Sequence, residues 1–172
     1  MLKKISVPVT DFGDNTQRVI KDLLDTMANE PMAGLSAPQI GELVRIFVVD
    51  ISPKSNDGNG TDGAEAFVNP EIIKKSEETF SWREGCVSIP GHRGEVKRFK
   101  NIILRYQDSF GHTKEREVMD YLSGCFQHEI DHLNGILWVD YQTAIKREFV
   151  RKKMIKLKTL PKEEQKWPRG PK

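Results

Sequence analysis

Residues 127–135, with the sequence QHEIDHLNG, constrain the fold of this chain more than any other stretch. An α-helix places residues four apart on one face, so His128 and His132 can bind the same metal ion. Glu129 is turned about 100° from His128 around the helix axis, which puts a carboxylate near the metal but off the ligand face. Gly135 then predicts the end of the helix.

Apolar residues recur at helical spacing through the same stretch, at Leu122, Phe126, Ile130 and Leu133. This pattern predicts that one side of the helix packs into a hydrophobic core. It is equally typical of an amphipathic helix whose histidines are merely buried side chains. The five residues HEIDH alone do not decide between a metal site and that simpler alternative.

The composition predicts a single soluble globular domain. The chain has 172 residues, of which 37% are hydrophobic and 30% charged, enough to bury a core without disulfides. No run approaches the roughly 18 consecutive apolar residues of a membrane span. The N-terminus shows the pattern of neither a signal peptide nor a transit peptide, so we expect a cytoplasmic protein of bacterial type, with an organelle as the alternative. Two cysteines, Cys86 and Cys125, are too few for a disulfide framework and favour a reducing compartment.

The formal net charge of +2 combines an acidic body with a basic tail. Residues 146–172 contain eleven Lys or Arg against three Glu, whereas the preceding residues contain sixteen against twenty-two. Such a tail predicts contact with a polyanion, for example a nucleic acid. A solvated helical face is an alternative of equal weight.

A basic helix is predicted over residues 142–160, followed by a disordered tail over residues 161–172. The apolar positions of this helix, set among the basic residues, are Ile145, Phe149, Val150, Met154 and Leu157. Pro161 is expected to end the helix. Residues 1–141 then form the core of the predicted domain.

A second chemically informative stretch follows a predicted N-terminal helix that ends at Pro31. The candidate caps of that helix are Asp14, Asn15 and Thr16. Residues 33–41, AGLSAPQIG, are mostly small residues with Pro and Gly, which lets the backbone approach a ligand closely. Gln39 supplies a polar group near the end of this stretch, although the stretch alone also fits any tight loop.

Strands and turns are predicted for most of the middle of the chain. Residues 44–50 predict a buried strand, and residues 52–64, rich in Gly, Asn and Asp, predict a surface loop. Further predicted elements are strands at residues 66–73, 96–98 and 102–106, a charged hairpin tip or edge at 74–78, and a turn at 108–111.

Cys86 lies in a third informative stretch, residues 84–90, EGCVSIP. A cysteine beside glycine has little bulk around its sulfur, which suits a metal thiolate, although a small buried hydrophobic side chain is the commoner role. A loop cysteine together with two helical histidines makes a three-ligand site that leaves the fourth tetrahedral position for water.

Together the three stretches predict metal-assisted amide hydrolysis. The metal lowers the pKa of the bound water, and Glu129 takes the proton and returns it to the leaving amine. The resulting oxyanion needs hydrogen-bond donors, which the side-chain amide of Gln39 and the backbone N–H of Val87 can supply.

The same stretches resemble, in order and spacing, the three signature motifs of the peptide deformylase family. The matching segments are GLSAPQ at residues 34–39, EGCVS at residues 84–88 and QHEIDH at residues 127–132. The resemblance extends from about Val7 to Tyr141. Three ordered motifs are far more specific than one.

Three positions depart from the usual motifs of the family. Met32 stands where the family has glycine, Ser36 where it has alanine, and Val87 where it has leucine. Met32 is expected to reshape the loop near the substrate, whereas Val87 keeps the backbone N–H on which its role depends.

The resemblance implies an α+β fold, with antiparallel strands wrapped around a central metal-binding helix and a helix towards each end of the chain. It also implies an enzyme that removes the N-formyl group from formyl-methionine at the start of newly made polypeptides. The implied metal is ferrous iron, with zinc or nickel as alternatives. The implied site residues are Cys86, His128 and His132 for the metal, Glu129 as acid and base, Gln39 and Val87 for the oxyanion, and Gly34 and Arg93 for the substrate. In this family the C-terminal helix docks on the ribosome, which gives residues 142–160 a partner; we expect a monomer with no membrane association.

Two other classes of metal protein remain open. A zincin-type metalloprotease would take its third ligand downstream, where Glu148 is the nearby candidate, but Arg151 and Lys152 at helical spacing predict a surface ion pair for it. A structural zinc module would need a fourth ligand and would have to recruit His92 or His112.

Cys125 is a further possible ligand, three residues before His128. Four protein ligands would leave no position for water, so we expect Cys125 to line the pocket or the core. A catalytically silent relative of the family is the last alternative, but every chemical group that the reaction needs is present.

Overall fold

The computed structural model describes residues 1–29, 32–51 and 63–159, and the chain divides into two compact units. Unit 1 comprises Met1–Phe80 and Arg98–Ile136, and unit 2 comprises Ser81–Lys97 and the chain from Leu137 onwards. Four predictions lie outside the described residues: the helix end at Pro31, the helix end at Pro161, the tail 161–172, and all but the last two residues of the loop 52–64. The prediction of a single domain stays a prediction.

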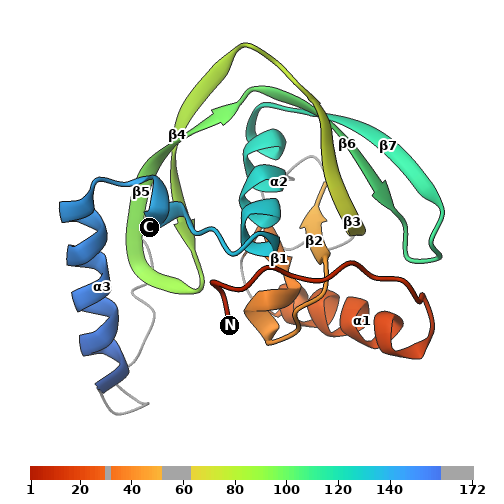
Figure 1. The fold of residues 1–172 in the computed structure, drawn as a ribbon, viewed down its shortest axis with the longest axis horizontal. Coiled ribbons are helices and arrows are strands. Elements are labelled where there is room, and N and C mark those ends of the chain that lie inside the picture. Colours follow the sequence, from red (N-terminus) through yellow and green to blue (C-terminus); the bar gives the residue numbers. More distant parts are fainter. Residues whose placement is uncertain (30–31, 52–62, 160–172) are drawn as a thin grey trace. The chain divides into compact units, whose positions relative to one another are not determined.

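Unit 1 contains a five-stranded antiparallel sheet with the strand order β1-β2-β3-β6-β7 (Figure 1). The strands are β1 (Gly34–Ser36), β2 (Ile46–Asp50), β3 (Ala64–Lys75), β6 (Asn101–Gln107) and β7 (Thr113–Met119). The helices of the unit are α1 (Asp14–Ala28), α2 (Asp120–Leu133) and the short 3-10 helix η1 (Ala37–Ile40).

The sequence of β2 explains why helices pack on both faces of this sheet. Ile46 and Val48 belong to one hydrophobic core, whereas Phe47 and Val49 belong to another, and all four are fully buried. The first core includes Val19, Ile20, Leu23 and Met27 of α1, and the second includes Phe126, Ile130 and Leu133 of α2. Successive side chains of a strand point to opposite faces, so α1 and α2 cover opposite faces of the sheet.

Three aromatic rings fix α2 on its face of the sheet. Phe47 and Phe67 stack across β2 and β3 with ring centroids 5.1 Å apart. Phe126 of α2 meets both rings edge-on, at 5.4 Å and 4.7 Å. Each such pair contributes about 0.5–1.5 kcal/mol beyond the burial of its area. The predicted packing of the apolar stripe of this helix is therefore confirmed.

The C-terminal end of α2 is held by the N-terminal segment. The backbone N–H of Ser6 donates to the carbonyl oxygen of Leu133 at 2.8 Å. Gly135 has a φ of +72°, and a Cβ at this position would lie 2.7 Å from the carbonyl oxygen of Lys3. Glycine avoids both the backbone strain and the clash, so the helix end predicted at Gly135 is confirmed.

Unit 2 contains most of the hairpin of β4 (Thr79–Cys86) and β5 (Ile89–Phe99), the 3-10 helix η2 (Trp138–Tyr141) and α3 (Ala144–Thr159). The buried side chains of its core are Cys86, Ile89, Val96, Trp138, Val139 and Val150. From α3 only Val150 is buried in this core, with Met154 packed against it. Ile145 is 85% exposed and Phe149 57% exposed.

The predicted caps of the first helix are wrong. The residue that precedes α1 is Gly13, and no side chain caps the helix. Asp14, Asn15 and Thr16 all lie inside it. The hydroxyl of Thr16 instead donates to the carbonyl oxygen of Asp11 at 2.7 Å, which ties the first turn to the preceding segment.

The structure confirms the α+β class, with α1 towards the N-terminus and α3 towards the C-terminus. It corrects the setting of Cys86, which is the last residue of β4 and not part of a loop. It also adds β7 and the first part of β4, which the sequence did not predict. No helix among the described residues is long and apolar enough to cross a membrane.

Candidate metal centre

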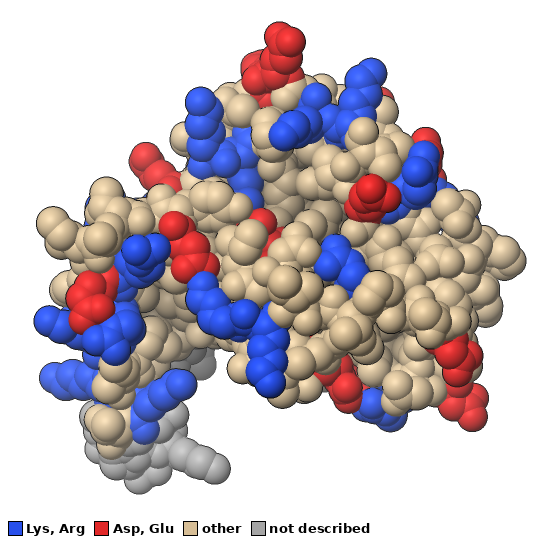
Figure 2. All heavy atoms as spheres, in the orientation of Figure 1, with Lys and Arg blue, Asp and Glu red and all other residues tan. Residues whose placement is uncertain are grey.

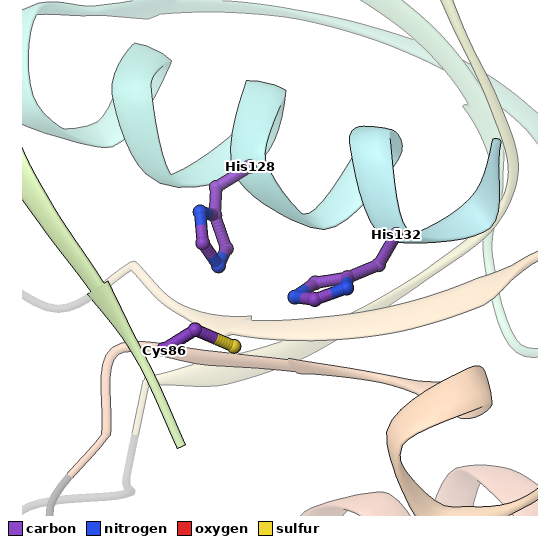
Figure 3. A group of neighbouring side chains, drawn as sticks. All are labelled: Cys86, His128 and His132. Atoms are coloured by element: carbon purple, nitrogen blue, oxygen red, sulfur yellow. The ribbon is translucent and has the colours of Figure 1, made fainter. Parts of the chain in front are cut away.

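One sulfur and two imidazole rings meet in a compact group of possible metal ligands. Cys86, His128 and His132 each offer one ligand atom, and these atoms all lie within 4.8 Å of one another. In Figure 3 both imidazole rings project from α2 towards the sulfur of Cys86. Ligand atoms around a tetrahedral ion with bonds of about 2.0–2.3 Å lie roughly 3.5 Å apart, so the group fits a single ion. This is the set of ligands that the sequence predicts.

The sulfur of Cys86 sits where the hairpin turns. Cys86 is 7% exposed, and the backbone N–H of Ser88 donates a hydrogen bond to its Sγ at 3.4 Å. This hydrogen bond helps to hold the sulfur in one position at the turn. Val87, between the two, lies in the turn and is 40% exposed.

Gly85 makes room for Arg93 on the neighbouring strand of the same hairpin. A Cβ at position 85 would lie 3.1 Å from the Cγ of Arg93. The absence of a side chain at Gly85 therefore lets the Arg93 side chain lie across β4, one residue before Cys86. The structure thus keeps Cys86, Val87 and Arg93, three predicted site residues, together in unit 2.

Glu129 lies on α2 between the two histidines and is 4% exposed. Gly34 of β1 faces its carboxylate, because a Cβ at position 34 would lie 2.9 Å from the Oε1 of Glu129. Any side chain at Gly34 would push this carboxylate aside. Unit 1 therefore supplies Gly34, Glu129 and the two histidines from adjoining elements.

Gln39 is held in one orientation by Ser36. The Oε1 of Gln39 accepts hydrogen bonds from both the backbone N–H and the hydroxyl of Ser36, each at 2.8 Å, across the helix η1. Because the oxygen is committed to two donors, the Nε2 end of the amide is turned away as the donor end. The sequence flags Ser36 only as a departure from the family motif, although the spacing Ser-x-x-Gln is that of a capping box and is a local signal for this contact.

The additional ligands that the two alternative metal sites would need lie elsewhere in the structure. The carboxylate of Glu148 binds Arg151 at 2.7 Å on α3, and this hydrogen bond keeps the pKa of Glu148 below its usual value. His92 and His112 lie outside the metal-ligand group found among the described residues. Cys125 is buried on α2 and also lies outside that group, as expected for a residue that lines the interior.

Comparisons with known proteins agree over almost the whole chain. A sequence profile of the polypeptide deformylase family matches residues 1–148. A peptide deformylase of Rickettsia akari (strain Hartford) is 45% identical over 158 residues, which cover 91% of this chain and 90% of that protein. A peptide deformylase of Rhodopseudomonas palustris (strain TIE-1) is 41% identical over 155 residues, which cover 90% of this chain and 87% of that protein.

Solved structures are also similar to this chain over nearly its whole length. A crystal structure of a peptide deformylase from Legionella pneumophila superposes with a TM-score of 0.83 at 38% identity, covering 96% of this chain and 92% of the other. A peptide deformylase from Ehrlichia chaffeensis in complex with actinonin superposes with a TM-score of 0.84 at 31% identity, covering 92% of each chain. The chain therefore belongs to the peptide deformylase family, whose members are metal-dependent hydrolases, and it is an enzyme of that family.

Proposed function

We propose that this enzyme removes the formyl group from the N-terminal formyl-methionine of newly made polypeptides. The grouping of Cys86, His128 and His132 in a chain of this family carries the proposal. The reaction breaks the bond between the formyl carbon and the methionine nitrogen, and it yields formate and a free amine.

Cys86, His128 and His132 are proposed to hold one divalent metal ion. When bound, such an ion supplies Lewis acidity, which polarises a carbonyl group and lowers the pKa of water towards neutrality. A thiolate with two imidazoles suits iron, zinc or nickel and disfavours magnesium and calcium. We propose ferrous iron as the native ion; equal activity after purification in air and under nitrogen would argue for zinc or nickel instead.

Glu129 is proposed to act first as general base and then as general acid. Its carboxylate takes a proton from the water that attacks the formyl carbon and delivers it to the leaving amine nitrogen. The burial of Glu129 and its tight packing against Gly34 support this role, because they limit where the carboxylate can go.

The oxygen of the formyl group becomes negative as water adds, and it needs hydrogen-bond donors. We propose that the Gln39 side-chain amide and the Val87 backbone N–H supply them. The two hydrogen bonds from Ser36 to the Gln39 oxygen support this assignment, since they leave the amide nitrogen as the donor end. Gly34 and Arg93 are proposed to line the path of the peptide.

The proposed reaction is tested with formyl-Met-Ala-Ser and its acetylated twin. We expect release of formate and a free amine from the formylated peptide and no hydrolysis of the acetylated one. Actinonin, which is bound to the Ehrlichia chaffeensis enzyme, should inhibit the release. A folded, metal-loaded protein that hydrolyses neither peptide would contradict the proposal.

Ser36→Ala should lower kcat by about two- to tenfold while KM changes little. The variant removes one of two hydrogen bonds to the Gln39 oxygen, and one such bond is worth about 0.5–1.5 kcal/mol. The backbone N–H of Ser36 remains as the other donor. Steady-state kinetics on the formylated tripeptide check this expectation, with the Tm of the variant as the control for folding. A wild-type kcat would mean that the hydroxyl plays no part in orienting Gln39.

We propose that α3 docks the enzyme on the ribosome. Lys and Arg side chains gather over α3, at the left of Figure 2. Its lysines and arginines are exposed, and the exposed Ile145 and Phe149 add apolar area to the same helix. We also propose that the enzyme is a cytoplasmic monomer.

Replacing Lys146, Lys152 and Lys156 together by Gln should weaken ribosome binding and leave peptide turnover unchanged. For each phosphate that the variant no longer neutralises, the slope of log affinity against log salt should become shallower by about one. Deleting α3 is a poorer test, because it would remove Val150 from the core that contains Cys86. Sedimentation with ribosomes over a salt series gives the measurement. Equal ribosome affinity of the wild-type protein and the triple variant at low salt would mean that the basic face is only a solvated surface.

A further inference from the structure

A row of polar side chains on α2 binds the end of β5 inside unit 1. Ser123, Gln127 and Asp131 are spaced four apart, so they share one face of the helix. All three bind the last two residues of β5, Arg98 and Phe99. Ser123 is fully buried and Gln127 is 6% exposed.

The hydrogen bonds in this row satisfy both backbone polar groups of Phe99. The hydroxyl of Ser123 and the Nε2 of Gln127 both donate to the carbonyl oxygen of Phe99 at 2.8 Å. The backbone N–H of Phe99 donates back to the Oε1 of Gln127 at 3.1 Å. At the far end of the row, the Nη1 of Arg98 lies 2.6 Å from the Oδ2 of Asp131, with side chains 4% and 13% exposed.

The position of this row around the helix gives it a consequence for the metal ligands. Each residue turns the helix by about 100°. In residues 126–128, and again in residues 130–132, the first residue is apolar, the second belongs to the row and the third is a histidine. The row therefore lies between the buried apolar stripe of α2 and the stripe that carries His128 and His132.

Apolar burial alone does not fix the rotation of a helix finely. The hydrophobic effect is not directional, whereas hydrogen bonds weaken steeply when their geometry is disturbed. A rotation of about 20° would move an imidazole nitrogen roughly 6 Å from the helix axis by about 2 Å. A working site tolerates errors of only about 0.5 Å.

We propose that Ser123, Gln127 and Asp131 form a positioning seam that sets the rotation of α2 and thereby aims His128 and His132. This inference rests on the proposed function, because it takes the two histidines as metal ligands. None of the three is a member of the group of possible metal ligands. They act through the helix backbone, by binding Arg98 and Phe99.

Gln127→Met and Asp131→Ala test the seam, with Leu122→Ala as the matched control. Leu122 lies on the same helix and packs against the second core, outside the seam. We expect both seam variants to bind Co²⁺ about tenfold or more weakly, since the loss of a residue that orients metal ligands typically costs about 10–100-fold in affinity. Their Co²⁺ absorption bands should change in intensity, and kcat should fall while KM stays nearly constant. Leu122→Ala should lower the Tm but keep the wild-type Co²⁺ spectrum and affinity.

Asp131→Asn should restore most of the affinity that Asp131→Ala loses, because the amide oxygen still accepts a hydrogen bond from Arg98. Ser123→Ala and Asp131→Asn also serve as milder variants if the others do not fold. Seam variants that lose Tm but keep the wild-type Co²⁺ affinity and spectrum would overturn the proposal. Cys86→Ser, measured beside them, separates this failure from a failure of the proposed function: undiminished Co²⁺ binding by that variant would mean that the metal lies elsewhere.

Discussion

Glu129→Gln should lower kcat by about 10²–10⁴-fold, the usual contribution of a general base, while the metal content stays at the wild-type value. The amide has nearly the size of the carboxylate, so it fits the buried space between α2 and Gly34. It cannot accept the proton that the attacking water must lose. Metal analysis and steady-state kinetics on the formylated tripeptide give the two measurements.

The metal content decides how this result is interpreted. Lost turnover with full metal content assigns the defect to proton transfer. Lost turnover with lost metal would mean that the substitution disturbs His128 or His132, the histidines on either side of Glu129 along the helix. A folded and fully active Glu129→Gln protein would mean that another group is the base.

Cys86→Ser should reduce metal affinity by more than about 100-fold, since the loss of a residue that only orients metal ligands typically costs about 10–100-fold. A serine hydroxyl stays protonated near neutral pH and is a much weaker ligand than a thiolate. The substitution is small, and the backbone of the turn after β4 is unchanged, so the protein should remain folded. Competition with a chelator measures the affinity, and circular dichroism checks the fold.

Cys125→Ser is the matched control for that substitution. Cys125 is also buried, but it lies outside the metal-ligand group. The variant should keep about one metal ion per chain. If Cys125→Ser lost the metal and Cys86→Ser kept it, the metal ligand would be Cys125 and not Cys86.

Local patterns are sufficient to predict much of the candidate site. The spacing of His128 and His132 on a helix needs only the 3.6-residue period, and the apolar stripe beside them fixes which face is buried. Cys86 was ambiguous alone and gained its meaning from the order of the three motifs. Local patterns therefore predict a site well when its geometry repeats with the helix or is encoded in a contiguous motif.

Partners that are distant in the sequence could not be predicted in this way. Gln127 is a motif residue, yet its role in the seam depends on the backbone of Phe99. A sequence does not show which backbone groups a side chain binds. Strand β7 carries mostly exposed polar side chains, so it lacks the alternation that identifies a strand, and its pairing with β6 alone defines it. The apolar period predicts the helix α1 but not its cap, because Gly13 has no side chain that could signal it.

The contact between the N-terminal segment and the end of α2 also orders the events of folding. Ser6 is synthesised before its partner Leu133, which is made about 130 residues later; at 5–20 residues per second this takes roughly 6–25 s. Contacts so distant in sequence close late and slow the folding of a domain. Gly135 must likewise be synthesised before Lys3 can pack beside it. The segment around Ser6 therefore reaches its native position only after the chain has grown past the end of α2, and α2 becomes fully anchored only then.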